Sequence, residues 1–217
     1  MSDITHAIGT MRLVPVIVIN EEENAYPLAQ ALKAGGLPCA EITFRTAAAE
    51  RCLRAMAADS EMLLGAGTVL NPEQVDRAVE AGARYIVTPG FSAEVVRACK
   101  ANSIPIFPGV STATELQMAL EAGIEVVKVF PAEVIGGLGL LKALASPFSM
   151  MRFIPTGGIS LSQLADYLAF PPVLAVGGSW IAPSSLITAK RFAEITELAS
   201  QSVAVCQAAP ASKEAGR

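Results

Sequence analysis

The residue whose type and place could do chemistry most directly is a lysine inside an apolar stretch. Lys128 lies in EVVKVFP (125–131), where a strand would put it on one face with Val126 and Phe130. Lysines are rarely buried without a reason. Desolvation or a neighbouring cation favours the neutral amine, which is the form that attacks a carbonyl carbon. The alternative is a lysine at a strand end that extends its ammonium group to water.

Charged residues also share one face of an earlier stretch. In EITFRT (41–46), strand alternation puts Glu41, Thr43 and Arg45 on one face and Ile42 and Phe44 on the other. A carboxylate in such a place can move protons, and an arginine can hold a substrate carboxylate through two parallel hydrogen bonds. The alternative is a structural ion pair between Glu41 and Arg45 at the rim of the fold.

Glycine clusters offer places where the backbone could approach an anion. TGGIS (156–160) and GGSW (177–180) follow the last two apolar runs, and Ser160 or Ser179 could add a hydroxyl. GAGT (65–68) could place Thr68 beside them, although a plain tight turn explains its glycines equally well. Together, the lysine, the carboxylate, the arginine and the glycine loops predict a Schiff-base enzyme that acts on an oxo-acid phosphate.

Composition excludes several other classes of function. His6 is the only histidine in the 217 residues, so Ser-His-Asp triads and multi-histidine zinc sites are excluded, and we expect it to lie on the surface of a frayed N-terminal segment. A net charge of -4 gives no basic surface for nucleic acid. The longest strongly apolar stretch, 13–19, is far shorter than the roughly 20 residues that cross a bilayer. No secretory signal is recognisable, so we expect a cytoplasmic location.

Cysteine usage agrees with this expectation. The four cysteines are widely spaced and form no CxxC pair, which predicts buried, reduced thiols rather than a disulfide framework or a zinc site. They are Cys39, Cys52, Cys99 and Cys206.

Short apolar or β-branched runs and helix-start signals must position these residues. We expect eight strands, within 14–19, 39–44, 62–65, 85–88, 105–107, 125–130, 152–154 and 173–176. Helix starts are predicted at Asn20, Thr46, Asn71, Ser92, Thr112 and Ser160, each followed by Glu or Gln. Three helices should end on an Ala-Gly pair with Gly35, Gly82 or Gly123 in the left-handed conformation.

A strand and a helix that repeat about every 27 residues, eight times in 217, predict an α/β protein with a single (β/α)8 TIM barrel domain. In a barrel the C-terminal strand ends line the active site, and the loops after the last two strands often bind phosphate. The alternative is a doubly wound open sheet, for which we find no GxGxxG after the first strand. We expect the domain to span 1–207 and the small, polar tail 208–217 to be disordered.

Several motifs also resemble one known family, in order along residues 8–200. They are similar to motifs of the bacterial 2-keto-3-deoxy-6-phosphogluconate (KDPG) aldolases, which also cleave 4-hydroxy-2-oxoglutarate. The motifs are EITFRT (41–46), GAGTVLNPEQ (65–74), VTPGFS (87–92), FPGVSTATEL (107–116), VKVFPAE (127–133), RFIPTGGIS (152–160) and GGSW (177–180). The resemblance implies a class I aldolase of the Entner-Doudoroff pathway that yields pyruvate and glyceraldehyde 3-phosphate. It also implies a homotrimer that needs no metal or other cofactor.

The resemblance further implies roles for individual residues. Lys128 would be the Schiff-base lysine and Glu41 the acid and base, while Arg45 with Thr68 would hold the pyruvate carboxylate. The remaining implied substrate contacts are Pro89 and Thr156, which would line the site, and Gly157, Gly158, Gly177, Gly178 and Ser179, which would cradle the phosphate.

One stretch departs from the pattern, and three alternatives stay open. VIGGLGLL (134–141) is more apolar than expected after the FPAE motif, which bears on the distal end of the substrate. A 6-phosphogalactonate aldolase would differ only in substrate stereochemistry. A sugar-phosphate isomerase or epimerase would share the glycine loops but would not need the lysine. A non-catalytic barrel that binds sugar phosphates would be stabilised by ligand without turnover.

Overall fold

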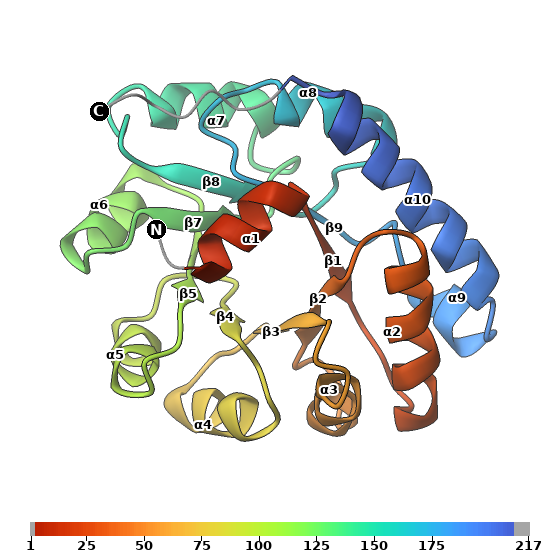
Figure 1. Ribbon diagram of the computed structural model, residues 1–217. Coiled ribbons are helices and arrows are strands. Elements are labelled where there is room, and N and C mark those ends of the chain that lie inside the picture. The colour runs from red at the N-terminus through yellow and green to blue at the C-terminus, as the bar shows by residue number, and fades with distance from the viewer. Residues whose placement is uncertain (1–2, 211–217) are drawn as a thin grey trace.

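The computed structural model describes residues 3–210, and every strand pairing in it is parallel (Figure 1). The strands form two hydrogen-bonded sheets, in the orders β5-β4-β3-β2-β1-β9 and β6-β7-β8. Their bounds are β1 Leu13–Ile17, β2 Cys39–Thr43, β3 Leu63–Gly67, β4 Tyr85–Val87, β5 Ile106–Phe107, β6 Gly109–Val110, β7 Val126–Val129, β8 Arg152–Pro155 and β9 Val176–Gly178. Each of the eight expected runs overlaps a strand. The sequential order differs from the doubly wound alternative, in which strand order reverses at a switch point.

The two sheets approach each other at two places. Pro108 separates β5 from β6, and isolated bridges join Phe153 to Val173 and Thr156 to Gly177 between the segments of β8 and β9. Proline has no N–H to donate, which explains why the expected strand 105–107 ends before Pro108 and why pairing starts again in β6, which was not expected. The architecture is therefore an α/β fold whose parallel strands lie in a curled sheet.

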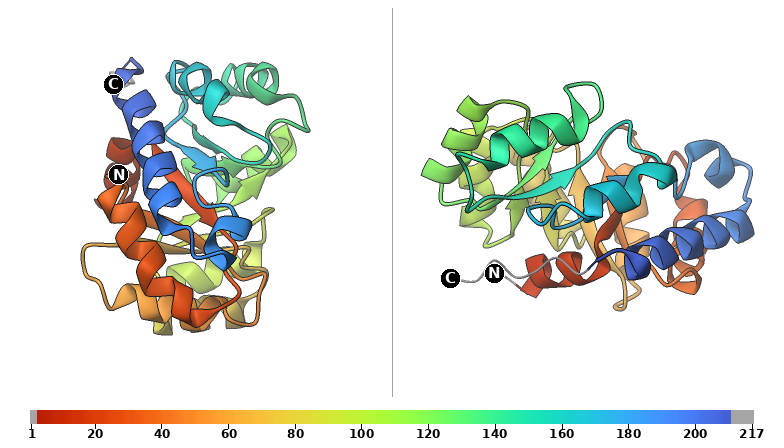
Figure 2. Two further views of the ribbon diagram at one scale, coloured as in Figure 1. Left: turned by 90° about the vertical axis from the view of Figure 1, so that its right-hand side faces the viewer. Right: turned by 90° about the horizontal axis from the view of Figure 1, so that it is seen from above.

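All the helices but the first cover the outside of the strands (Figures 1 and 2). Their bounds are α1 Asp3–Met11, α2 Ala25–Ala34, α3 Ala49–Ala57, α4 Pro72–Glu80, α5 Ala93–Ala101, α6 Ala113–Glu121, α7 Gly137–Ala145, α8 Leu164–Leu168, α9 Ser184–Thr188 and α10 Phe192–Ala208, with short 3-10 helices η1 Glu22–Asn24 and η2 Leu161–Gln163. Within residues 3–210, none of the helices combines the length and the apolar character that a membrane crossing needs.

Four of the predicted helix starts are confirmed. Asn71, Ser92 and Thr112 are N-caps whose side chains accept a hydrogen bond from the first turn of α4, α5 and α6, and Ser160 forms a capping box at η2. The starts at Asn20 and Thr46 are wrong. η1 begins after Glu21 rather than at Asn20. α3 begins after Ala48, because the Thr46 hydroxyl donates to Ile19 O at 2.6 Å instead of capping the helix.

The expected glycine helix ends are confirmed twice and wrong once. Gly82 and Gly123 have φ of 95° and 74°, in the left-handed region, but Gly35 has φ of -78° and Gly36, with φ of 78°, takes the left-handed position. Gly35 is small for another reason. A Cβ there would lie 2.5 Å from Ala199 Cβ, so its missing side chain lets α2 pack closely on α10.

The prediction of a frayed N-terminal segment is wrong, because residues 3–11 form helix α1. In Figure 1 this helix lies across the end of the strands, inside the circle of outer helices. Ile8 is fully buried in a cluster with apolar side chains from several strands, including Val14, Tyr85 and Phe107. His6 is exposed on the same helix, as predicted. Burial of one face therefore makes a short helix out of a stretch with weak sequence signals.

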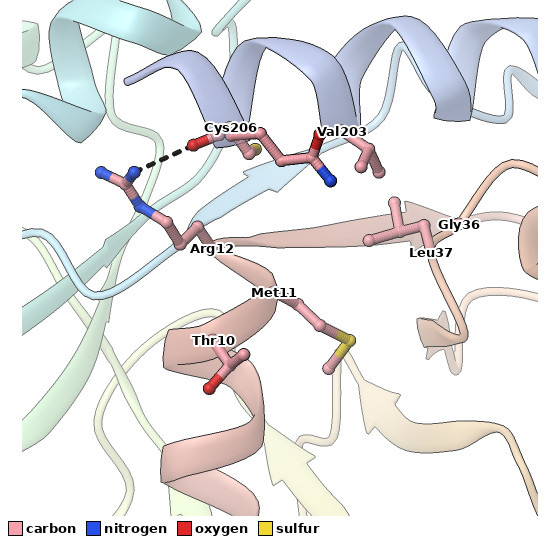
Figure 3. Close-up of a pocket in the computed structure, with 8 residues that line it drawn as sticks. Thr10, Met11, Arg12, Gly36, Leu37, Val203 and Cys206 are labelled. Atoms are coloured by element: carbon pink, nitrogen blue, oxygen red, sulfur yellow. Dashed lines mark hydrogen bonds between the residues drawn. The ribbon is translucent and has the colours of Figure 1, made fainter. Parts of the chain in front are cut away.

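Arg12 joins the start of the fold to its last helix. Its guanidinium donates to the carbonyl oxygens of Cys206, Ala209, Leu168 and Pro210, at 2.8–3.0 Å. Figure 3 shows the bond to Cys206 beside a pocket of about 300 Å³ between α1 and α10, which is lined by none of the predicted site residues. Helix α10 reaches Ala208, and Ala209 is buried. Of the expected tail, residues 211–217 lie outside the described residues.

Candidate active site

Two charged side chains from separate sheets meet inside the strands. Lys128 of β7 and Glu41 of β2 are only 4% and 3% exposed, and Lys128 Nζ donates to Glu41 Oε1 at 3.1 Å. An ion pair this deeply buried gains little net stability, because both ions lose their water. A functional reason for the pair is therefore favoured over a structural one.

Small residues on neighbouring strands make room for this pair. A Cβ on Gly67 of β3 would lie 2.1 Å from Glu41 Oε1, so Glu41 fits only because that position is glycine. Lys128 is level with Gly109 on one side and with Ile154 on the other. Its Nζ also lies 5.3 Å from the centre of the Phe130 ring. The amine therefore stands among apolar groups with one carboxylate as its charged partner.

Arg45 and Thr68 lie beside each other just past the ends of their strands. Strand β2 ends at Thr43, so Arg45 is exposed beyond the strand rather than continuing its alternating face. Its Nε donates to Thr68 Oγ1 at 3.2 Å, and Thr68 follows Gly67 in the left-handed conformation with φ of 56°. An exposed arginine next to a hydroxyl can bind a carboxylate that enters from solvent.

The two later glycine clusters differ from each other. Gly157 and Gly158 form a loop after β8 with φ of 100° and 81°, where a side chain would be strained. Gly177 and Gly178, expected in a loop, instead belong to β9 and pair with Val14 and Pro15 of β1. The prediction that Gly177 and Gly178 form a loop is wrong. Glycine is needed there because neighbouring side chains occupy the space of a Cβ, not because the chain turns.

Thr156 and Trp180 occupy the space beside Gly177 and Gly178. A Cβ on Gly177 would lie 2.2 Å from Thr156 Oγ1, and one on Gly178 would lie 2.7 Å from the Trp180 ring. Thr156 is buried just after β8, and its hydroxyl donates to Ile154 O at 3.3 Å. Ser179 is exposed immediately after β9. The strand glycines thus bring Thr156 and Ser179 to the same end of the strands as the 157–158 loop.

Sequence reasoning gave Pro89 a role but missed the residue that holds it. Thr88, buried at the end of β4, donates its hydroxyl to Gly90 O at 2.7 Å and accepts a bond from Gly109 N at 3.1 Å. A Cβ on Gly109 would lie 2.2 Å from the Pro89 carbonyl group. A polar residue at the end of an apolar run, as in VTPG, was the available signal for Thr88. Phe130 beside Lys128 was missed because aromatic residues next to strands are ordinary core residues.

The side chains that meet in the site suit imine chemistry. Among residues 3–210, no group of three or more His, Cys, Asp or Glu side chains is arranged to hold a metal ion. What the site does bring together is an amine, a carboxylate at hydrogen-bond distance, and an arginine with a hydroxyl nearby. Such a set can add an amine to a carbonyl group and move the protons that this addition requires.

Comparison with known proteins identifies the family. Residues 4–198 match the family described as aldolase, KDPG and KHG aldolase. The chain belongs to this family. The expectation drawn from the motifs is thereby confirmed. The chain is 47% identical over 206 residues to a 2-dehydro-3-deoxy-phosphogluconate aldolase of Treponema pallidum, a match that covers 94% of this chain and 98% of the relative.

Solved structures of KDPG aldolases have the same fold. A Legionella pneumophila KDPG aldolase, with pyruvate captured as a covalent carbinolamine, is 40% identical with a TM-score of 0.88 and covers 92% of this chain and 97% of its own. A Zymomonas mobilis 2-keto-3-deoxy-6-phosphogluconate aldolase with 3-phosphoglycerate is 39% identical with a TM-score of 0.87 and covers 94% and 96%. Members of this family thus include an enzyme that forms a covalent bond to pyruvate and one that was crystallised with a phosphorylated acid.

Proposed function

We propose that this protein is a class I aldolase, a carbon–carbon lyase that cleaves 2-dehydro-3-deoxy-6-phosphogluconate to pyruvate and D-glyceraldehyde 3-phosphate. We include cleavage of 4-hydroxy-2-oxoglutarate to pyruvate and glyoxylate. The observation that carries the proposal is the buried Lys128–Glu41 pair, with Nζ and Oε1 3.1 Å apart. Membership of the KDPG and KHG aldolase family, and the covalent pyruvate in the Legionella relative, support it.

Lys128 forms the covalent bond in the proposed mechanism. Transfer of a proton from Lys128 Nζ to the adjacent Glu41 carboxylate frees the amine, which attacks C2 of the oxo acid. The carbonyl oxygen takes up a second proton from the attacking nitrogen to give a neutral carbinolamine, while Glu41 keeps the first. Glu41 then supplies the proton with which this hydroxyl leaves as water, and an iminium ion remains on Lys128.

Cleavage follows from the iminium ion as an electron sink. Glu41, directly or through a water molecule, removes the proton of the C4 hydroxyl. The C3–C4 bond breaks, its electron pair moves into the iminium to give an enamine, and glyceraldehyde 3-phosphate leaves. Protonation of the enamine at C3 and addition of water release pyruvate and restore the amine. A proton carrier beside Lys128 in each of these steps would account for the burial of the Glu41 carboxylate there.

The two ends of the substrate meet different groups. Arg45 and Thr68, joined by a hydrogen bond, hold the pyruvate carboxylate, and Pro89 with Thr156 lines the site between them and the loop. At the other end, the phosphate is cradled by the backbone N–H groups of Gly157 and Gly158, by the end of β9 at Gly177 and Gly178, and by the exposed Ser179 hydroxyl. Gly157 and Gly158 carry no side chains of their own and have left-handed φ angles that glycine adopts easily, so an anion can approach their backbone closely.

We propose that the curled sheets close into one eight-stranded barrel of the (β/α)8 type in a single domain spanning 1–207. Sequential strand order, the continuity of β5 and β6 across Pro108, and the bridges from β8 to Val173 and Gly177 support closure. The contact between Lys128 of β7 and Glu41 of β2 also supports it, because side chains of non-adjacent strands meet in a barrel interior.

We propose a homotrimer in the cytoplasm. Tyr26, Leu70 and Val134 are large apolar side chains that are 59–81% exposed, as a subunit interface would require. The four cysteines are free thiols, and burial raises the pKa of Cys52 and Cys206 to about 11, which fits a reducing compartment. Light scattering should give a mass three times the 22.5 kDa of one chain.

We also propose that catalysis needs no metal or other cofactor, because the iminium ion supplies the electron sink. Dialysis against a chelator should leave kcat unchanged. A loss of activity that added Mg²⁺, Mn²⁺ or Zn²⁺ restores would contradict this part of the proposal.

Trapping by borohydride tests the function itself. Reduction in the presence of pyruvate should convert the imine into a stable secondary amine and add the mass of the reduced adduct to the peptide that contains Lys128. Borohydride without pyruvate is the control. An enzyme that still turns over but gives no adduct on Lys128 contradicts the Schiff-base mechanism. Cleavage rates on phosphogluconate- and phosphogalactonate-derived substrates then decide the stereochemistry, and we expect the former to be faster.

A further inference from the structure

Glu133, four residues after β7, has its carboxylate held from the side of η2 and α8. The Tyr167 hydroxyl donates to Oε1, and Gln163 Nε2 donates to Oε2 at 2.8 Å. Burial and the bond to Glu133 raise the pKa of Tyr167, so this hydroxyl keeps its proton and remains a donor. Neither partner carries a positive charge. The carboxylate is therefore fixed in place by two neutral donors.

The backbone of the same residue holds the glycine loop. Glu133 N donates to Gly157 O at 3.0 Å, and the preceding Ala132 N donates to Thr156 O at 2.8 Å. A Cβ on Gly158 would lie 2.8 Å from Glu133 Cβ, so the loop packs directly on the Glu133 side chain. Any shift of Glu133 must therefore move Gly157 and Gly158.

Gln163 completes a closed set of bonds around the loop. Its Oε1 accepts from Ser160 N at 3.0 Å and from Ser160 Oγ at 2.8 Å, while its Nε2 donates to Glu133. The segment 157–160 is thus held at its first residue by the Glu133 backbone and at its last residue, through Gln163, by the Glu133 carboxylate. A single residue, Glu133, thus holds both ends of the loop, one through its backbone and the other through its side chain.

We propose that Glu133 is a positioning residue that sets the 157–158 loop for the phosphate end of the substrate. The inference rests on the proposed function, in which that loop binds phosphate. Glu133 bonds the loop and its supports, whereas Lys128 pairs with Glu41. Loosening Glu133 should therefore weaken the binding of a phosphorylated substrate and spare a substrate that has no phosphate.

The test compares two substrates and two matched variants. In Glu133→Gln an amide nitrogen replaces one oxygen, so the side chain cannot accept from both Tyr167 and Gln163. KM for 2-dehydro-3-deoxy-6-phosphogluconate should rise about 10- to 100-fold, while kcat/KM for 4-hydroxy-2-oxoglutarate stays within about twofold. Asp166→Asn makes the same atomic change in the same pocket of about 430 Å³, but Asp166 takes part in none of these bonds and this variant should behave like the wild type.

Equal losses on both substrates, or no loss on either, overturn the proposal. If Glu133→Gln does not fold, Tyr167→Phe removes one donor only and should show the same selective rise in KM at about three- to tenfold. Failure of the proposed function is seen separately and earlier. In that case the wild-type protein cleaves neither substrate, and borohydride gives no pyruvate adduct on Lys128.

Discussion

The two ends of the same strands carry different kinds of side chain. On β7, Val126 belongs to the buried apolar cluster closed by Ile8 of α1, while Lys128, two residues further on, pairs with Glu41. On the neighbouring strand, Ile154 belongs to that cluster and Thr156 to the candidate site. A step of two residues along a strand keeps the same face, so the change from apolar to polar occurs along one continuous interior.

This difference separates stability from chemistry. Apolar burial at the α1 end stabilises the fold at about 25 cal/mol per Å² removed from water. The buried ion pair at the other end contributes little or nothing, because desolvation offsets its attraction. We therefore expect variants at the polar end to lose turnover above all, with some loss of stability where one buried charge is left without its partner, and variants at the apolar end to lose stability while kcat is kept.

Removal of the amine should have the largest effect. Lys128→Met keeps an unbranched side chain of similar length but cannot form an imine, so kcat should fall by roughly 10⁴ to 10⁶. Borohydride trapping with pyruvate should fail. Val126→Ala on the same strand is the control, and it should lose stability in a urea titration while kcat is kept. If Lys128→Met keeps a kcat within tenfold of the wild type, the reaction does not take place at the polar end of the strands.

Neutralising the Glu41 carboxylate should have the second-largest effect on kcat. Glu41→Gln keeps the shape and a hydrogen-bond acceptor for Lys128 but cannot take up protons, so kcat should fall about 10² to 10⁴-fold. Stopped-flow or coupled assays of pyruvate release measure this fall in kcat. Glu50→Gln, which loses surface bonds to Arg54 and Arg77, is the matched control and should leave kcat unchanged. A near-wild-type rate for Glu41→Gln would mean that the carboxylate is structural.

At the apolar end, Ile8→Ala should cost about 2 to 5 kcal/mol of unfolding free energy, because a fully buried side chain is lost from the cluster under α1. The measurement is chemical denaturation, with kcat taken well below the melting temperature and expected to be unchanged. His6→Ala on the exposed face of the same helix should stay within about 0.5 kcal/mol. A fall in kcat with stability intact would show that α1 serves the chemistry as well.

The polar end was easier to predict from the sequence than the apolar end. Parallel strands buried on both faces need apolar residues almost throughout, so Glu41 and Lys128 stand out in a chain with few charges. Their contact does not follow from local pattern, because it depends on which strands come to face each other. The helix starts at Asn71 and Thr112 were readable for a different reason, since one side chain there satisfies a backbone N–H of its own helix.

The errors arose where tertiary contacts decide. Helix α1 exists because Ile8 is buried by distant strands, which no signal within residues 3–11 reveals. Gly177 looks like a turn residue in the sequence, but it lies in β9 because Thr156 occupies the space of its side chain. Thr46 resembles an N-cap, yet its hydroxyl bonds Ile19 O from another segment. In each case the partner is far away in the chain.

The smallest effect should come from one hydroxyl in the apolar cluster. Tyr85 is buried there, its ring fills the side-chain space of Gly65, and its hydroxyl donates to Ala40 O at 3.2 Å. Tyr85→Phe should lower the unfolding free energy by about 1 kcal/mol at pH 7, because one net hydrogen bond is lost. Chemical denaturation at a series of pH values measures this difference.

The same variant has a pH dependence whose sign is fixed by burial. Burial, helped by electrostatic interactions with Cys39 and Glu41, raises the pKa of Tyr85 well above 10 in the folded protein. The unfolded tyrosine ionises near pH 10, so stability contributed by the neutral hydroxyl is complete below pH 10 and is lost as pH rises toward the folded pKa. At pH 11 the wild type should have lost about 1.4 kcal/mol that the variant keeps, so the variant should then be the more stable of the two by about 0.4 kcal/mol. A difference that stays constant from pH 7 to pH 11 would mean that Tyr85 reaches water, and that α1 does not seal this end of the strands.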